Sequence, residues 1–73
     1  MKKYLILVEK TLPGYSAYSS DLDGCVSTGA TKQEVEQKIC EAVKFHLDGL
    51  REEGLIVPEP HTYCTYVEIP TKN

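Results

Sequence analysis

Tryptophan is absent from this 73-residue sequence, and phenylalanine and methionine occur once each. With so few large apolar side chains the chain can build only a small core, and a chain of this length buries about 60 % of the surface that its unfolded form exposes. Small domains are usually supported by disulfides, by a metal or by association with another chain. The sequence therefore has to be searched for each of these supports.

Cysteine is scarce as well. Cys25, Cys40 and Cys64 are an odd number at wide spacing, so they form neither a paired disulfide framework nor a Cys-x-x-Cys zinc motif. We expect buried free thiols in a reducing compartment and no bound metal. Disulfides and metals are thereby set aside as supports, and association with another chain remains.

The sequence also lacks a long hydrophobic run and a basic stripe. The apolar run of residues 4–8 stops at Glu9, too early for a signal peptide or a membrane span, which predicts a cytoplasmic protein without membrane contact. Eight basic against eleven acidic residues give a net charge of −3, which disfavours direct nucleic-acid binding and suits a basic protein partner. Association as a homodimer or a higher homo-oligomer is the working expectation.

Three strands are expected before residue 30. Residues 4–8 are almost continuously apolar, which is typical of an inner strand that is covered on both faces. Pro13 and Gly14 suit the centre of a type II turn, and the alternating residues 15–19 then predict the second strand of a hairpin. Residues 25–28 predict a short third strand after an acidic turn.

A long amphipathic helix is expected next. Thr31 and Glu34 have the spacing of a capping box, and Gly54 has the place of a left-handed C-terminal cap, so the helix should cover residues 32–53. One apolar stripe at helical spacing should lie on the sheet. The stripe contains Val35, Ile39, Ala42, Val43, His46, Leu47 and Leu50.

The remaining residues predict an extended segment. Pro58 and Pro60 forbid helix, and residues 62–69 alternate and are rich in Thr, Tyr and Val, as a last strand would be. The sequence thus predicts one α+β domain over residues 1–73 with the order βββαβ. In this fold an antiparallel three-stranded meander packs on one long helix, and the last strand follows a proline-rich loop.

The residues do not assemble a catalytic set. Asp21 and Asp23 beside Gly24 have the chemistry to hold a divalent cation, but acidic residues are also selected in turns for local hydrogen bonds, and we favour that interpretation. His46 and His61 have no nucleophile at a recognisable spacing. We therefore expect a protein without enzymatic activity or cofactor.

The order of several short motifs is more specific than any one of them. In sequence they are residues 14–18 (GYSAY), 21–25 (DLDGC), 28–31 (TGAT), 34–42, Gly54 and 57–60 (VPEP). Over residues 3–69 this order resembles the HicB antitoxin family. The resemblance implies a partly degraded RNase H-like βββαβ domain that neutralises a small, basic HicA-type toxin, a ribonuclease that cleaves messenger RNA through a histidine.

The resemblance implies that the antitoxin covers the active site of the toxin. We expect the partner contact in the region of the second strand and the acidic loop. The residues expected to have structural roles are Gly14, Thr31, Glu34, Gly54, Pro58 and Pro60. The expected contact residues are Tyr15, Tyr18, Asp21, Leu22, Asp23, Gly24 and Cys25.

Two departures from the family pattern qualify this expectation. Ser20 and Asp23 stand where the family loop commonly has prolines, and no C-terminal DNA-binding module is expected after the last strand. Two alternatives stay open, namely an orphan scaffold of the same fold and a magnesium-dependent RNase H-like nuclease. The nuclease would use Asp21 and Asp23 with Glu34 or Glu41.

Overall fold

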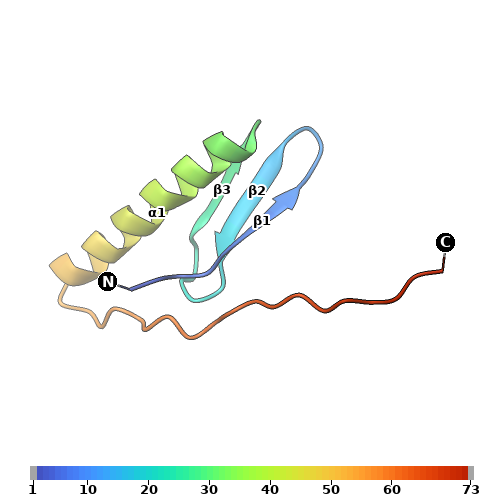
Figure 1. Cartoon of the computed structure of the whole chain (residues 1–73). Helices are drawn as coiled ribbons and strands as arrows, with labels where there is room; N and C mark the ends of the chain where they lie inside the picture. The colour runs from blue at the N-terminus through green and yellow to red at the C-terminus, as the bar shows by residue number, and fades with distance from the viewer. Residues whose placement is uncertain (1, 73) are drawn as a thin grey trace.

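A computed structural model describes residues 2–72 and contains a three-stranded antiparallel sheet, one helix and a long extended tail (Figure 1). The strands are β1 (Ile6–Lys10), β2 (Tyr15–Ser19) and β3 (Val26–Gly29), and the helix is α1 (Lys32–Glu52). The helix lies across one face of the sheet, over β3 and β2 more than over β1. The α+β class and the meander followed by one long helix are confirmed.

The strand order β1-β2-β3 makes β2 the central strand. Ala17 of β2 lies opposite Val8 of β1 and Ser27 of β3, so its side chain points to the helix-covered face together with Val8. β1 was expected to be an inner strand and is instead an edge strand, with Val8 39 % exposed. The expectation fails because, within residues 2–72, no strand pairs with the outer edge of β1.

The turn between β1 and β2 differs from the expected type II turn. The Leu12–Pro13 peptide bond is cis, and Gly14 does not have the positive φ that a type II turn would give it. Glycine is required here for another reason, since a Cβ on Gly14 would collide with the carbonyl oxygen of Gly29. Gly14 is thus the residue that lets β2 begin close beside the end of β3.

The helix begins at the expected cap. Thr31 has extended backbone, and its Oγ1 accepts a hydrogen bond from the Glu34 N–H at 3.1 Å. The Glu34 carboxylate accepts from the N–H of Ala30, one residue before the position that a capping box would use. Both residues still satisfy backbone donors at the start of the helix, as the sequence predicted.

The helix ends in a Schellman motif. Gly54 has a φ of 71°, its N–H donates to the Arg51 carbonyl, and the Leu55 N–H donates to the Leu50 carbonyl at 2.9 Å. The left-handed cap predicted at Gly54 is confirmed. The motif turns the chain away from the helix axis and starts the tail.

The core is small and lies between the helix and the sheet. Its fully buried apolar members are Ala17, Leu22, Cys25, Val35 and Ile39. The rest of the predicted helix stripe is half-buried around them, and Tyr4, Ile6 and Tyr15 pack against the cluster from the sheet side. The predicted stripe is confirmed as the face that α1 turns to the sheet.

The C-terminal tail (residues 55–72) is extended and makes no strand in this chain. It crosses beneath the end of the sheet and continues past β1, which gives the molecule its longest dimension of 55 Å (Figure 1). The last strand expected at residues 62–69 is therefore not formed here. Its residues have β-forming sequence, but a strand also needs a neighbouring strand for its backbone hydrogen bonds, and the segment has none within residues 2–72.

Candidate partner-binding surfaces

The first part of the tail is fastened to the loop between β2 and β3 by Asp21. The Asp21 side chain is fully buried, and its Oδ1 accepts a hydrogen bond from the Thr62 hydroxyl at 2.6 Å. Its Oδ2 accepts from the backbone N–H groups of His61 and Thr62 at 3.3 and 3.4 Å. We call these contacts the Asp21 clasp. They fix the point at which the rest of the tail leaves the sheet.

The clasp also sets the ionisation of Asp21. The Thr62 hydroxyl, the two backbone N–H groups and the nearby His61 ring together lower the pKa of the carboxyl below its ordinary value, although burial opposes the shift. His61 Nδ1 lies 3.1 Å from Oδ1. The carboxylate is therefore held in its charged form as a structural acceptor.

A second attachment joins the proline-rich loop to the N-terminal segment. The Tyr4 hydroxyl donates to the Pro58 carbonyl at 2.6 Å, and Lys2 Nζ lies 2.7 Å from a Glu59 carboxylate oxygen. Proline has no backbone N–H, so the backbone of Pro58 can take part in a hydrogen bond through its carbonyl oxygen as an acceptor. The Pro58 carbonyl thus joins the proline-rich loop to the N-terminal segment, and the structural role expected for Pro60 stays a prediction.

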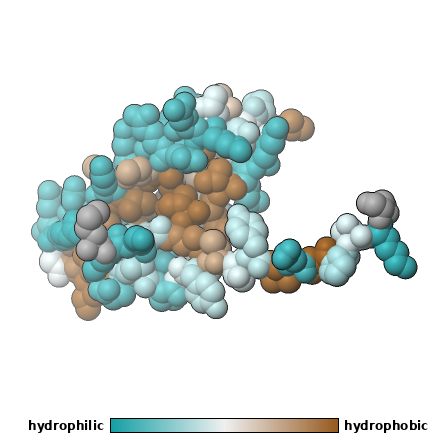
Figure 2. All heavy atoms as spheres, in the orientation of Figure 1, coloured by the Kyte–Doolittle hydropathy of each residue, from teal (hydrophilic) through white to brown (hydrophobic). Residues whose placement is uncertain are grey.

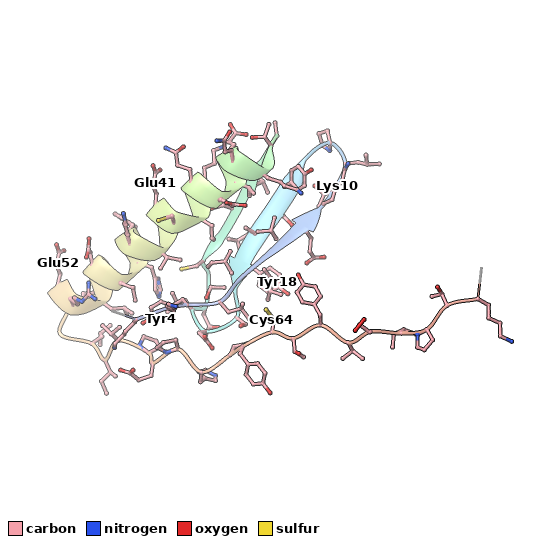
Figure 3. All side chains as sticks on the ribbon, in the orientation of Figure 1. Tyr4, Lys10, Tyr18, Glu41, Glu52 and Cys64 are labelled. Atoms are coloured by element: carbon pink, nitrogen blue, oxygen red, sulfur yellow. The ribbon has the colours of Figure 1, made fainter. Side chains whose placement is uncertain are left out.

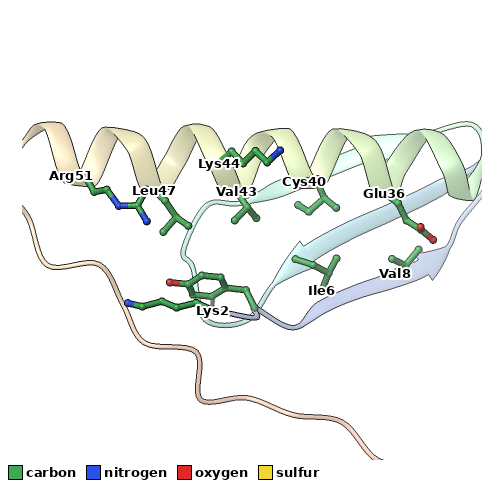
Figure 4. Close-up of a pocket in the computed structure, with 11 residues that line it drawn as sticks. Lys2, Ile6, Val8, Glu36, Cys40, Val43, Lys44, Leu47 and Arg51 are labelled. Atoms are coloured by element: carbon green, nitrogen blue, oxygen red, sulfur yellow. The ribbon is translucent and has the colours of Figure 1, made fainter.

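An apolar groove of about 1030 Å³ opens between β1 and α1 (Figure 4). Its walls are Tyr4, Ile6 and Val8 from the sheet side and Ile39, Cys40, Val43 and Leu47 from the helix, and its charged rim is Lys2, Glu36, Lys44 and Arg51. Figure 2 shows the same region as an apolar patch facing the viewer between the helix and the tail. We call this hollow the β1 groove.

A smaller hollow of about 360 Å³ lies at the acidic loop and the C-terminal half of the helix. Gly24 and Cys25 form one side, and Phe45, His46 and Leu50 are among the helix residues of the other. The Phe45 ring is 82 % exposed. We call this region the Phe45 surface, and aromatic side chains are enriched at protein interfaces.

The structure divides the contact residues predicted from the sequence into two groups. Leu22 and Cys25 belong to the core and Asp21 to the clasp, so their side chains are engaged inside the domain. Tyr15 and Tyr18 lie on opposite faces of the sheet, the first half-buried and the second 38 % exposed.

Asp23 and Gly24 remain exposed, and the φ of 82° at Gly24 suits glycine in this turn. Sequence reasoning missed Phe45. The sequence could have drawn attention to Phe45, because it is the sole phenylalanine of the chain and lies outside the apolar stripe of the helix.

The three thiols differ in their environments. Cys25 is buried, and this burial raises the pKa of its thiol, whereas Cys40 and Cys64 are exposed. The expectation of buried thiols is thus right for Cys25 and wrong for the other two. Cys40 lies at the β1 groove, and Cys64 lies in the extended tail (Figure 3).

The residues proposed for a nuclease do not converge. Asp21 uses both carboxylate oxygens in the clasp, and in residues 2–72 no three His, Cys, Asp or Glu side chains come close enough together to share one ion. Across that same range, no helix has the length and apolar character needed to cross a bilayer.

Comparison with known proteins agrees with this picture. Residues 4–71 match the model of the HicB_like antitoxins of bacterial toxin-antitoxin systems. This chain belongs to the HicB-like antitoxin family. A solved structure described as a HicA3 and HicB3 toxin-antitoxin complex contains a chain of similar fold, with a TM-score of 0.68 and 33 % identity, over 82 % of this chain and 70 % of that one.

Two curated relatives have no described activity in their names. The HicB-like chain is 40 % identical over 57 residues to a UPF0150 protein of Synechocystis, covering 77 % of this chain and 72 % of that protein. It is 33 % identical over 67 residues to an uncharacterized 14.9 kDa protein from the rep-hol intergenic region of Haemophilus phage HP1. That match covers 92 % of this chain and half the length of the phage protein.

Proposed function

We propose that this HicB-like protein is an antitoxin that binds a small HicA-type toxin and covers its active site without any catalysis of its own. Two likenesses support the proposal. The sequence matches the HicB-like antitoxin family, and the fold matches that of a chain in a solved HicA–HicB complex. The toxin would meet messenger RNA in the cytoplasm, so the antitoxin acts there. It works as a homo-oligomer, because its own core is small.

The Phe45 surface is the part of the molecule that best suits the toxin. Phe45 offers a large aromatic side chain, the kind that often supplies most of the binding energy at protein interfaces. Glu53 lines the same hollow, and Glu41 and Glu52 point away from the sheet on the outer side of α1 (Figure 3). The family resemblance implies a basic toxin, which these three carboxylates would attract and orient.

Coexpression with a HicA-type toxin tests the proposal. The wild-type chain should copurify with the toxin and restore the growth that the toxin stops. Phe45→Ala should weaken the complex by about tenfold or more. Val26→Ala is the matched control, since Val26 is 62 % exposed on the sheet. It should bind as the wild type does.

Two results would contradict the proposal at different levels. Absence of binding to every HicA-type toxin tried, including the product of any short basic gene beside this one, would favour the orphan scaffold. Full binding by the Phe45 variant would keep the antitoxin function and move the contact elsewhere.

A further inference from the structure

β1 has the sequence of an inner strand and the position of an edge strand. Residues 4–8 are almost continuously apolar, yet β1 has a neighbour on the β2 side alone, and Val8 on its helix-facing side is 39 % exposed. An edge strand also presents unpaired backbone N–H and C=O groups. The free edge of β1 and the β1 groove beside it therefore have the properties of a place for one more strand.

The tail has the sequence of a strand and no neighbour. Residues 62–69 are extended and alternate, so that Tyr63, Val67 and Ile69 share one side of the segment. These three side chains are 84, 73 and 70 % exposed. Eight extended residues measure about 26 Å, which is enough to follow the whole of β1.

We propose that residues 62–69 of a second copy lie along the free edge of β1, with Tyr63, Val67 and Ile69 in the β1 groove. The first copy returns its own tail in the same way, so the contact occurs twice in the dimer. The two sheets each gain a fourth strand, and the apolar patch of each groove is covered. The inference deepens the homo-oligomer of the proposed function by naming the segment that joins the copies, and it does not depend on a toxin.

The occupant comes from another copy because the chain's own tail leads away from the groove. The Asp21 clasp holds Thr62 at the end of the sheet, and the tail then continues past β1 (Figure 1). No residue beyond Arg51 lines the groove within the part of the chain that the structure describes. Reciprocal exchange also doubles the buried area, which helps to reach the 1,200–2,000 Å² or so that stable interfaces bury.

The rim of the groove suits the tail better than it suits a basic toxin. Lys2, Lys44 and Arg51 outnumber Glu36 at this rim, where Lys2 pairs with Glu59 and Arg51 with Asp48, and residues 62–69 carry no basic residue. A basic protein would meet like charge at this rim, which disfavours docking. The β1 groove and the Phe45 surface thus have different occupants.

Sedimentation equilibrium of the full chain tests the exchange. Val67→Asp places a charge on the groove side of the tail and should weaken the dimer about tenfold or more. Tyr66→Asp places the same charge on the opposite side of the same segment and should change the dimer constant less than about threefold. Val67 and Tyr66 are both exposed in the single chain, so neither variant should unfold it.

Mixing two variants separates strand exchange from other dimers. Val8→Asp damages the groove but leaves the tail intact, and Val67→Asp does the reverse. Each alone should dimerise about tenfold or more weakly than the wild type, while their mixture should form a heterodimer through the one remaining intact tail and groove. Circular dichroism confirms that Val8→Asp is folded; if it is not, Val8→Thr, which keeps the branched shape, takes its place.

Three results would overturn the inference. They are a wild-type chain that stays monomeric at high concentration, a dimer that Val67→Asp leaves unchanged, and a mixture that fails to associate. If Val67→Asp leaves the dimer unchanged and abolishes toxin binding instead, the tail is assigned to the toxin. Because no toxin is present in the sedimentation experiments, failure of the antitoxin proposal would not alter their outcome.

Discussion

Two segments of this protein have similar β-forming sequences and different surroundings. β2 (Tyr15–Ser19) and residues 62–69 both alternate and both contain two tyrosines. β2 pairs with a strand on each side and buries Ala17 completely, whereas the tail segment pairs with none and leaves Tyr66 97 % exposed. The comparison shows that a β-forming sequence favours extended backbone, whereas pairing with neighbouring strands stabilises the extended segment as part of a sheet.

The largest expected effect is on the free energy of unfolding, which a core substitution should lower much more than a tail substitution. Ile39→Ala removes a side chain that is 2 % exposed between helix and sheet and should cost about 2–5 kcal/mol of unfolding free energy. Val67→Ala should change the stability of the dilute chain by no more than about 0.5 kcal/mol. Urea denaturation measures both. Equal losses in the two variants would mean that the tail packs on its own domain.

A pair of glycines gives the next largest effect. Gly14→Ala forces a Cβ against the Gly29 carbonyl and should cost about 1–3 kcal/mol, because backbone must move. Gly49→Ala adds a Cβ in open space within α1 and should stabilise by about 0.5–1 kcal/mol. Thermal denaturation compares them. A neutral Gly14→Ala variant would show that the approach of β2 to β3 is loose.

The third largest expected effect on stability concerns the N-terminal cap of the helix at Thr31. Thr31→Ala removes the acceptor for the Glu34 N–H and should cost about 1 kcal/mol. Thr71→Ala is the matched control, because Thr71 is exposed in the tail. Loss of helical circular dichroism on heating reports the difference. If Thr71→Ala were as harmful as Thr31→Ala, the stability would not be concentrated in the helix and sheet.

The smallest effect concerns the Asp21 clasp. The pKa of Asp21 is lowered in the folded chain, so the clasp is complete above the ordinary value of 3.8 and is lost as the pH falls below it. The Thr62 amide signal in NMR should therefore shift with a midpoint below 3.8. Asp21→Asn should abolish that transition. A midpoint above the ordinary value would contradict the clasp.

Local signals in the sequence predicted much of this fold. The bounds of β2, the cap at Thr31 and the left-handed Gly54 depend on residues within a few positions of one another, and the structure agrees with each. Non-local features were harder. The partner of residues 62–69 is set by pairing between distant segments or between chains, and a single sequence does not contain it.

The candidate surfaces show the same division. The sequence drew attention to residues 21–25, but it could not show that Leu22 and Cys25 face the core or that Asp21 fastens the tail 41 residues away at Thr62. The inner-strand character of residues 4–8 was visible in the sequence and conflicts with the edge position of β1. That conflict is what points to a missing strand.

Hydrogen exchange of the amides of residues 63–69 tests the central claim most directly. The account predicts that protection of these amides rises with the concentration of the chain alone, together with the sedimenting mass, and that Val67→Asp removes it. Exchange that stays fast at every concentration, or protection that is already complete in the monomer, would contradict the claim that the tail completes the sheet of a second copy.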